Sequence, residues 1–375
     1  MKRFVYADNA ATTRMDEKAF EAMKPYLLNE YGNPSQPYSF SRVPKKAIQE
    51  SREIIASCIG ALPEEIYFTS GGTESDNWAI KSAALLNSQK AATITSAFEH
   101  HAVLHSCEAI ERQGYPVAYL WPSREGYITA EILKNIITDR TFLVSVMFAN
   151  NEIGTVQPIK ELCSIAHMNG ALFHTDAVQV VGHMPINVHD LEVDMLSASA
   201  HKFNGPKGVG FMYVKKGVEL PSFVDGGAQE REHRAGTENV AGIVGMASAL
   251  KHNCENLQEN IQHLKELECS LIKQLDSMGV EYVRNGGVDV LPGLISLSFQ
   301  NADGEAILHR LDLDGICIST GSACNSKSTE ISHVLRAIRL DEAYARGTIR
   351  ISLEKTNTMD DVEAICRALR KIFIC

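Results

Sequence analysis

The chain has 375 residues, a length that suits one large domain with a smaller companion. Its net charge of −10 argues against a general nucleic-acid or anionic-membrane binder, because nothing in it would attract phosphate non-specifically. No apolar run approaches the roughly 18 residues needed to cross a bilayer. Because no apolar stretch follows the basic residues near the start, we expect no signal peptide and a cytoplasmic location.

The 9 cysteines are scattered along the chain, and none of them forms a CxxC pair. An odd count without a signal peptide argues against a disulfide framework. His101 and His105 have a spacing that could bind zinc on a helix, but the glutamate of an HExxH motif is missing, so we predict no metal site. The cysteines therefore matter as single thiols.

Short apolar runs typical of strands alternate with helical stretches or loops through the middle of the chain. The runs are 66–70, 92–96, 141–148, 171–176, 193–199 and 208–214. This alternation predicts an α/β fold with a mostly parallel central sheet covered on both faces. The last two runs are separated by a short Gly-Pro segment, so we expect that pair to be antiparallel.

A long helical pattern follows from about residue 243 to 275, and a helix of that length commonly links two domains. After it, the runs 294–299, 316–320 and 348–353 are typical of strands in a smaller α/β unit. We expect the extreme N-terminus to pack with this unit. The predicted domains are therefore a large one, 14–250, and a small one formed by 1–13 and 251–375.

Three segments carry residues suited to chemistry. The segment 71–77 (GGTESDN) lies where a strand leads into a helix, so it is either an anion site or a capping turn made by Thr73 or Ser75. Asp176 ends a buried-type strand and needs a positive partner, which a cofactor ring nitrogen or an arginine could supply. Lys202 follows another strand and precedes a tight Gly-Pro turn, a setting that favours Schiff-base chemistry over a plain surface lysine.

Cys324 differs from the other cysteines in its surroundings. It lies in GSAC, within a stretch from about 319 to 333 that has little apolar periodicity. We predict a mobile loop there, and a thiol on such a loop is placed for reaction rather than packing. Cys163, Cys317 and Cys366 sit in apolar runs and better suit small buried side chains.

These segments, taken with others in the same order, resemble the cysteine desulfurases, the NifS/IscS-type members of the fold-type I pyridoxal-phosphate (PLP) enzymes, in aminotransferase class V. The resemblance runs nearly from end to end. It rests on DNAATT at 8–13, GNPS at 32–35, SGGTESDN at 70–77, EHHAVL at 99–104, NNEIGTVQP at 150–158, HTDAVQ at 174–179, SAHKFNGPKG at 199–208, RAGTENV at 234–240, STGSACNS at 319–326 and IRISL at 349–353.

The resemblance implies a PLP site whose residues each hold one part of the cofactor. The roles are a covalent bond from Lys202, pairing of Asp176 with the ring nitrogen, a hydrogen bond from Gln179 to the ring hydroxyl, stacking and proton transfer by His100, phosphate binding by Thr73, Ser199 and His201, a further phosphate contact from Thr237 of a second subunit, and contact of Asn151 with ring and substrate. It also implies that Arg350, with Asn33, binds the substrate carboxylate.

The implied reaction takes sulfur from L-cysteine. The amine of Lys202 would remove the Cα proton, and the Cys324 thiolate would then attack the substrate sulfur, giving L-alanine and a persulfide. The persulfide would pass to an acceptor protein, either an iron–sulfur scaffold or a tRNA-thiolation enzyme. A homodimer is implied, with no nucleic-acid or membrane partner.

Several positions depart from the family pattern. Gln36 to Tyr38 replace a small residue and a nearby His, Ala228 and Glu232 stand where glycines are usual, and Glu354–Lys355 replaces Gly-Arg. Non-glycine residues do not freely take positive φ, so we expect the backbone near 228–232 to differ. Three alternatives stay open: a selenocysteine lyase, a class V aminotransferase without a sulfur role, and a catalytically idle scaffold.

Overall fold

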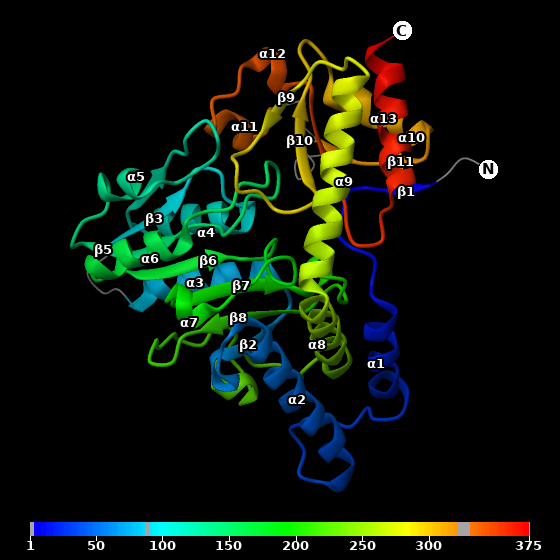
Figure 1. Cartoon of the computed structure of the whole chain (residues 1–375). Coiled ribbons are helices and arrows are strands. Elements are labelled where there is room, and N and C mark those ends of the chain that lie inside the picture. The colour runs from blue at the N-terminus through cyan, green and yellow to red at the C-terminus, as the bar shows by residue number, and fades with distance from the viewer. Residues whose placement is uncertain (1–3, 87–90, 321–330, 375) are drawn as a thin grey trace.

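A seven-stranded sheet forms the centre of the computed structural model, which describes residues 4–86, 91–320 and 331–374 (Figure 1). The strand order is β2-β8-β7-β6-β5-β3-β4, and β8 runs against the other six. The strands are β2 (Ile66–Thr69), β3 (Ala92–Ser96), β4 (Val117–Leu120), β5 (Thr141–Ser145), β6 (Leu172–Asp176), β7 (Met195–Ser199) and β8 (Gly210–Val214). The predicted mostly parallel sheet and its antiparallel last pair are confirmed. The half-buried edge strand β4 was not predicted.

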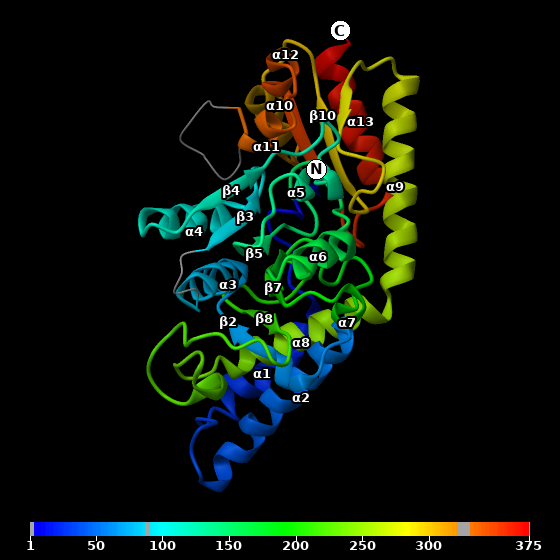
Figure 2. The same ribbon diagram turned by 90° about the vertical axis from the view of Figure 1, so that its left-hand side faces the viewer.

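Helices cover both faces of this sheet, as Figure 2 shows for α3 and α4 on one side and α6 and α7 on the other. Successive strand residues point to opposite faces, so Leu143 and Met195 pack with α3 and α4 while Val144 and Leu196 pack into the other core. The helices of this part are α1 (Glu17–Leu28), α2 (Arg42–Ile59), α3 (Gly72–Leu86), α4 (His101–Arg112), α5 (Ala130–Lys134), α6 (Ile159–Met168), α7 (Val188–Leu191) and α8 (Val240–Glu255).

A second, smaller sheet has the order β12-β13-β10-β9, and all its pairs are antiparallel. Its strands are β9 (Val283–Asn285), β10 (Leu294–Ser298), β12 (Ser319–Thr320) and β13 (Thr348–Ser352), and its helices are α9 (Leu257–Ser277), α10 (Gly304–Leu313), α11 (His333–Ala337), α12 (Glu342–Ala345) and α13 (Met359–Phe373). The N-terminal strand β1 (Val5–Tyr6) pairs with β11 (Ile316–Cys317) in this unit. The expected packing of the N-terminus with the C-terminal unit is thus observed.

The predicted long helical segment is two helices rather than one. It begins at Val240, breaks at Asn256 and continues as α9 to Ser277, which runs along the small sheet (Figure 1). At Asn256 the backbone leaves helical geometry, with φ −110° and ψ 14°. The separate apolar clusters support a division into two units, and the boundary near residue 250 remains our proposal. Within the described ranges, no helix has the length and apolar character of a membrane span.

Candidate active site

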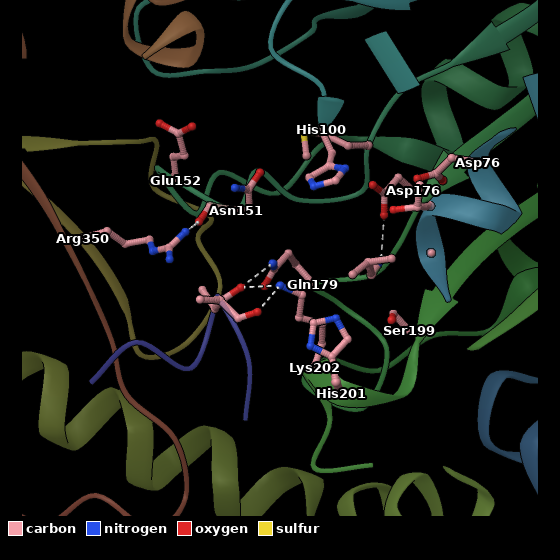
Figure 3. A pocket seen from close by; sticks show the side chains of 16 residues that line it. Asp76, His100, Asn151, Glu152, Asp176, Gln179, Ser199, His201, Lys202 and Arg350 are labelled. Carbon is pink, nitrogen blue, oxygen red and sulfur yellow. Dashed lines mark hydrogen bonds between the residues drawn. The ribbon is translucent and has the colours of Figure 1, made fainter. Parts of the chain in front are cut away.

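A cavity of about 320 Å³ opens at the carboxyl ends of the parallel strands, facing the small unit (Figure 3). Parallel strands point their carboxyl ends to one edge, so the loops after β2, β3, β5, β6 and β7 meet there. The lining residues come from these loops, from the segment after β1 and from β13. They are Ala10, Ala11, Gly72, Thr73, Asp76, His100, Met147, Asn151, Glu152, Asp176, Val178, Gln179, Ser199, His201, Lys202 and Arg350.

Lys202 enters the cavity from a short 3-10 turn, Ala200–Lys202, directly after β7. Its Nζ donates hydrogen bonds to the carbonyl oxygens of Ala10 at 2.6 Å and Ala11 at 2.8 Å. The backbone of Lys202 is also fixed, because its carbonyl oxygen lies 2.8 Å from Nε2 of His183. The carbonyl groups of Ala10 and Ala11 therefore hold the amine, and His183 fixes the backbone that carries it.

Asp176 is the last residue of β6 and is buried. Its Oδ1 accepts a 2.9 Å hydrogen bond from the Val178 amide. Burial raises the pKa of Asp176 to about 6, against the lowering effects of that hydrogen bond and of the Lys202 charge. A cation in the cavity would stabilise this carboxylate. Gln179, one turn further on, donates from Nε2 to the Ala10 carbonyl at 3.1 Å.

One end of the cavity is built to receive an anion. The N-terminus of α3 contributes Gly72 and Thr73, and the turn after β7 contributes Ser199 and His201. A Cβ on Gly72 would lie 2.5 Å from Cγ2 of Val178, so glycine allows the close approach of the two loops. Burial and the Lys202 charge lower the pKa of His201 to about 4, which leaves its ring neutral at pH 7.

His100 caps α4 and lines the opposite wall, with its ring directed into the cavity (Figure 3). Its Nδ1 accepts a 3.1 Å hydrogen bond from the Ala102 amide. Burial and the nearby Lys202 charge lower the pKa of His100 to about 4, so the ring is neutral. Because Nδ1 is the acceptor, the single ring proton belongs on Nε2, where it can be donated.

Arg350 reaches the cavity from β13 of the small unit. Its Nη1 donates to the Asn151 carbonyl at 2.8 Å and its Nη2 to Oδ1 of Asp8 at 2.7 Å. Its Nε is buried and has no hydrogen-bond partner among the described residues. Because Arg350 lines the cavity, its guanidinium suits a carboxylate ligand there.

The lining residues that sequence reasoning missed include two acids, Asp76 and Glu152, and Met147. A signal existed for Asp76, since it lies four residues after Gly72 and so on the same face of α3. Burial raises the pKa of Glu152 to about 7, against a hydrogen bond from Ser332 and the charge of Arg350. That bond is 2.6 Å long and joins the cavity to the residue before α11.

Two predicted site residues, Asn33 and Thr237, lie outside the cavity. Asn33, between α1 and α2, is partly exposed and accepts a local hydrogen bond from the Ser35 amide at 3.0 Å. Thr237 is exposed just before α8. Neither lines the cavity of its own chain. Cys324 falls in 321–330, outside the described residues.

The departures near residue 230 have a clear structural form. Glu232 takes φ 68°, and Glu230 and Arg231 before it take φ 44° and 58°. Ala228 keeps an ordinary φ of −82°, so only one of the two replaced glycines, that at 232, has a backbone conformation that favours glycine. A buried ion pair holds the strained turn, since Arg52 bonds both carboxylate oxygens of Glu230 at 2.6 and 2.9 Å.

The other departures are benign for the cavity. Gln36 to Tyr38 are exposed. Glu354 accepts a 2.8 Å hydrogen bond from Asn204, and Lys355 donates to Asn253 at 2.6 Å. Both replacements therefore join the end of β13 to the large unit.

The arrangement fits pyridoxal phosphate. It combines a held amine, a buried carboxylate, a glycine-lined helix N-terminus for a phosphate and a guanidinium for an amino-acid carboxylate. Each of these groups matches one functional group of the cofactor or of an amino acid.

Comparison with known proteins agrees with this fit. The aminotransferase class-V family matches residues 5–365. The cysteine desulfurases IscS of Clostridium botulinum and Dictyoglomus turgidum are 46% and 48% identical, and each alignment covers 99% of this chain and 95% of the relative. A solved NifS-like protein has a TM-score of 0.93 at 38% identity and covers 99% of both chains. SspA in complex with cysteine has a TM-score of 0.82 at 36% identity, covering 94% of this chain and all of that one. The resemblance drawn from the motifs is confirmed, and the chain belongs to the aminotransferase class-V family.

Proposed function

We propose that this chain is a PLP-dependent cysteine desulfurase that converts L-cysteine to L-alanine and leaves the sulfur as a persulfide on Cys324. One observation carries the proposal: the amine of Lys202 and the guanidinium of Arg350 face the same cavity from two different units of the chain. The cysteine desulfurases among its relatives and the cysteine bound to SspA favour cysteine as the substrate.

The residues at the strand ends would hold the cofactor by its different groups. We assign Lys202 to the carbonyl carbon, Asp176 to the ring nitrogen, Gln179 to the ring hydroxyl and His100 to the ring face. Thr73, Ser199 and His201 would hold the phosphate, and Asn151 would contact ring and substrate. When bound, PLP supplies an electron sink for the charge left when the substrate Cα loses its proton.

The chain's own groups would then move protons and sulfur. Released Lys202 is the amine available to take the Cα proton. The Cys324 thiolate attacks the substrate sulfur, so an S–S bond forms while the C–S bond breaks and its electron pair stays with the substrate. The substrate Cβ then takes a proton, and Cα regains a proton from the Lys202 ammonium, which completes alanine. His100 can donate the proton that Cβ takes, because its Nε2–H is the side of the ring that is not bonded to Ala102.

Two substitutions test the proposal. Cys324→Ser should keep the cofactor absorbance and its response to cysteine, but form neither persulfide nor alanine. Cys317→Ser is the matched control, since this half-buried thiol lies on β11 away from the cavity. Lys202→Ala should lose the covalent cofactor band. Undiminished persulfide formation by Cys324→Ser would refute the assignment.

We further propose that the protein acts as a homodimer. Thr237 is exposed, and Asn33 lies outside its own cavity, so both are available to a second copy. The segments that carry them touch, because Gln229 Nε2 lies 3.4 Å from the Ser35 hydroxyl. Exposed apolar side chains gather over the same region of α1 and α2. They are Phe20, Leu27, Leu28, Tyr31, Tyr38, Phe40 and Val43.

This arrangement predicts sedimentation as a dimer. It also predicts that mixing Lys202→Ala with Thr237→Ala chains restores part of the activity, because a mixed dimer then has one intact site. A fully active monomer would disprove the dimer proposal.

The acceptor of the sulfur and the choice between cysteine and selenocysteine belong to the same proposal. We expect cysteine to be turned over to alanine and a stoichiometric persulfide, which a class V aminotransferase without a sulfur role would not form. Parallel rates on cysteine, selenocysteine and cysteine sulfinate test the substrate. Adding an iron–sulfur scaffold or a tRNA-thiolation enzyme, and following transfer of labelled sulfur, tests the acceptor.

A further inference from the structure

Asp76 is a carboxylic acid in the cofactor cavity to which no role has been given. It lies one turn into α3, is 1% exposed and lines the cavity beside Asp176 (Figure 3). One oxygen of each aspartate and a ring nitrogen of His100 all lie within 4.8 Å of one another. Two carboxyl groups therefore face the same small volume that a cofactor ring would enter.

Among the residues that the structure describes, none with a positive charge contacts Asp76. Its Oδ1 is buried and has no hydrogen-bond partner among the described residues. Nε2 of His174 lies 3.7 Å from this oxygen, beyond hydrogen-bond distance. Burial lowers the pKa of His174 to about 3, so that ring is neutral. The side chain of Ser197 is also neutral; its hydrogen bond lowers the pKa of Asp76, against the effect of burial.

The negative charge of Asp176 has more stabilising contacts than that of Asp76 would have. It receives the Val178 amide at 2.9 Å and feels the charge of Lys202. Two neighbouring carboxyl groups in a buried site cannot both ionise freely, so one proton stays with the pair. Burial first, and then the charge of Asp176, raise the pKa of Asp76 well above its usual range. The proton therefore belongs on Asp76 and the negative charge on Asp176.

We propose that Asp76 is a positioning residue of the cofactor site: it stays a neutral carboxylic acid beside Asp176 and leaves Asp176 as the single anion that faces the ring nitrogen. This inference rests on the proposed function, because it assigns Asp176 to that nitrogen. A neutral acid keeps one O–H to donate, whereas a second carboxylate would repel Asp176 and shift the proton balance of the ring. Asparagine has a similar shape and also donates, so it should replace Asp76 in this role.

The test compares Asp76→Asn with Asp76→Ala in the full-length protein. The first readout is the dissociation constant of PLP, measured from pH 6 to 9 with cofactor-free protein. Asp76→Ala should weaken binding by about tenfold, the usual effect of losing one buried hydrogen bond. Asp76→Asn should restore it to within about threefold of the parent and leave the pH profile of the cofactor absorbance unchanged.

The second readout is the infrared band of a protonated buried carboxyl group, which a merely structural role would not predict. The band assigned to Asp76 should be present in the parent, with or without cofactor, and absent in Asp76→Asn. Glu99→Gln is the matched control: burial raises the pKa of Glu99 to about 8, Glu99 does not line the cavity, and its charge is the smallest of the causes that raise the pKa of Asp76. This variant should lose its own band and keep that of Asp76.

Two results would overturn the inference. One is that Asp76→Asn keeps every protonated-carboxyl band of the parent, or shifts the pH profile of the absorbance; Asp76 would then work as an anion. If Asp76→Ala binds PLP as tightly as the parent, Asp76 is no part of the site. Neither readout uses desulfurisation, so a parent that binds PLP but forms no persulfide would refute the proposed function alone.

Discussion

Replacing Arg350 by lysine tests how the chain recognises its substrate. Arg350 is 4% exposed, and two of its nitrogens already bond Asn151 and Asp8 at 2.8 and 2.7 Å. These bonds fix the plane of the guanidinium and leave the buried Nε–H as a donor without a partner among the described residues. Lysine keeps the charge but has no planar fork, so it cannot satisfy Asn151, Asp8 and a substrate carboxylate in the same geometry.

The size of the effect follows from the bonds that are lost. One hydrogen bond to a charged group is worth about 1.5–3 kcal/mol. Because 1.4 kcal/mol corresponds to a factor of ten, we expect KM for cysteine to rise by roughly 10- to 150-fold in Arg350→Lys. Cofactor binding should stay intact, since Arg350 is assigned to the substrate and not to PLP.

The assay is steady-state alanine formation over a wide range of cysteine concentrations, with the cofactor absorbance recorded alongside. Arg346→Lys is the matched control, because this exposed arginine lies four residues earlier and pairs with Glu342 at the surface. Its KM should remain within about twofold of the parent, as expected for an exposed ion pair. An unchanged KM in Arg350→Lys would show that the carboxylate is bound elsewhere.

Three further predictions concern stability. Burial raises the pKa of Glu99 to about 8 in the folded protein, against about 4.3 in the unfolded chain. Between these values the native state holds one more proton, so the free energy of unfolding falls as pH rises. Glu99→Gln should remove that fall, which denaturant titrations at about pH 5 and about pH 8 can measure. Glu232→Gly should stabilise by about 1 kcal/mol by relieving a positive φ, whereas Ala228→Gly should not, and equal changes in Tm would contradict this. Arg52→Met should cost about 3–5 kcal/mol by stranding buried Glu230, and adding Glu230→Gln should recover part of it in a denaturant titration.

Most of the cavity residues that the sequence predicted lie at or just beyond the ends of predicted strands. Asp176 and Lys202 each follow a buried apolar run, and parallel strands must bring such positions to one edge. The apolar runs also revealed every strand of the large sheet except β4, which is half-buried at the edge and therefore lacks a strong hydrophobic pattern. The break at Asn256 left no such sign, because apolar residues continue at helical spacing on both sides of it.

The residues that sequence reasoning missed depend on contacts between distant segments. Asp76 matters because α3 places it beside Asp176, a hundred positions later in the chain. Glu152 matters because Ser332, from the other unit, bonds it. The turn at Glu230 has positive φ values, and its support by Arg52 is visible only in the packed structure. Propensity and spacing describe segments, and these three cases depend on how the segments pack.

The register of the small sheet supports Cys324 as the reacting thiol. Ser319 of β12 is paired with Arg350 of β13, so β12 ends one residue beyond the arginine that we assign to the substrate carboxylate. Cys324 follows Thr320 by four residues, and four residues span at most about 14 Å. This length of chain starts beside Arg350, which lines the cavity, and is consistent with our proposal that Cys324 reacts there. Cys317 starts nearby in sequence, but its strand pairs with β1 and is held there by the Val5–Tyr6 ladder. The proposed thiol therefore follows the strand that pairs with Arg350, whereas Cys317 is fixed in the pair of β1 and β11.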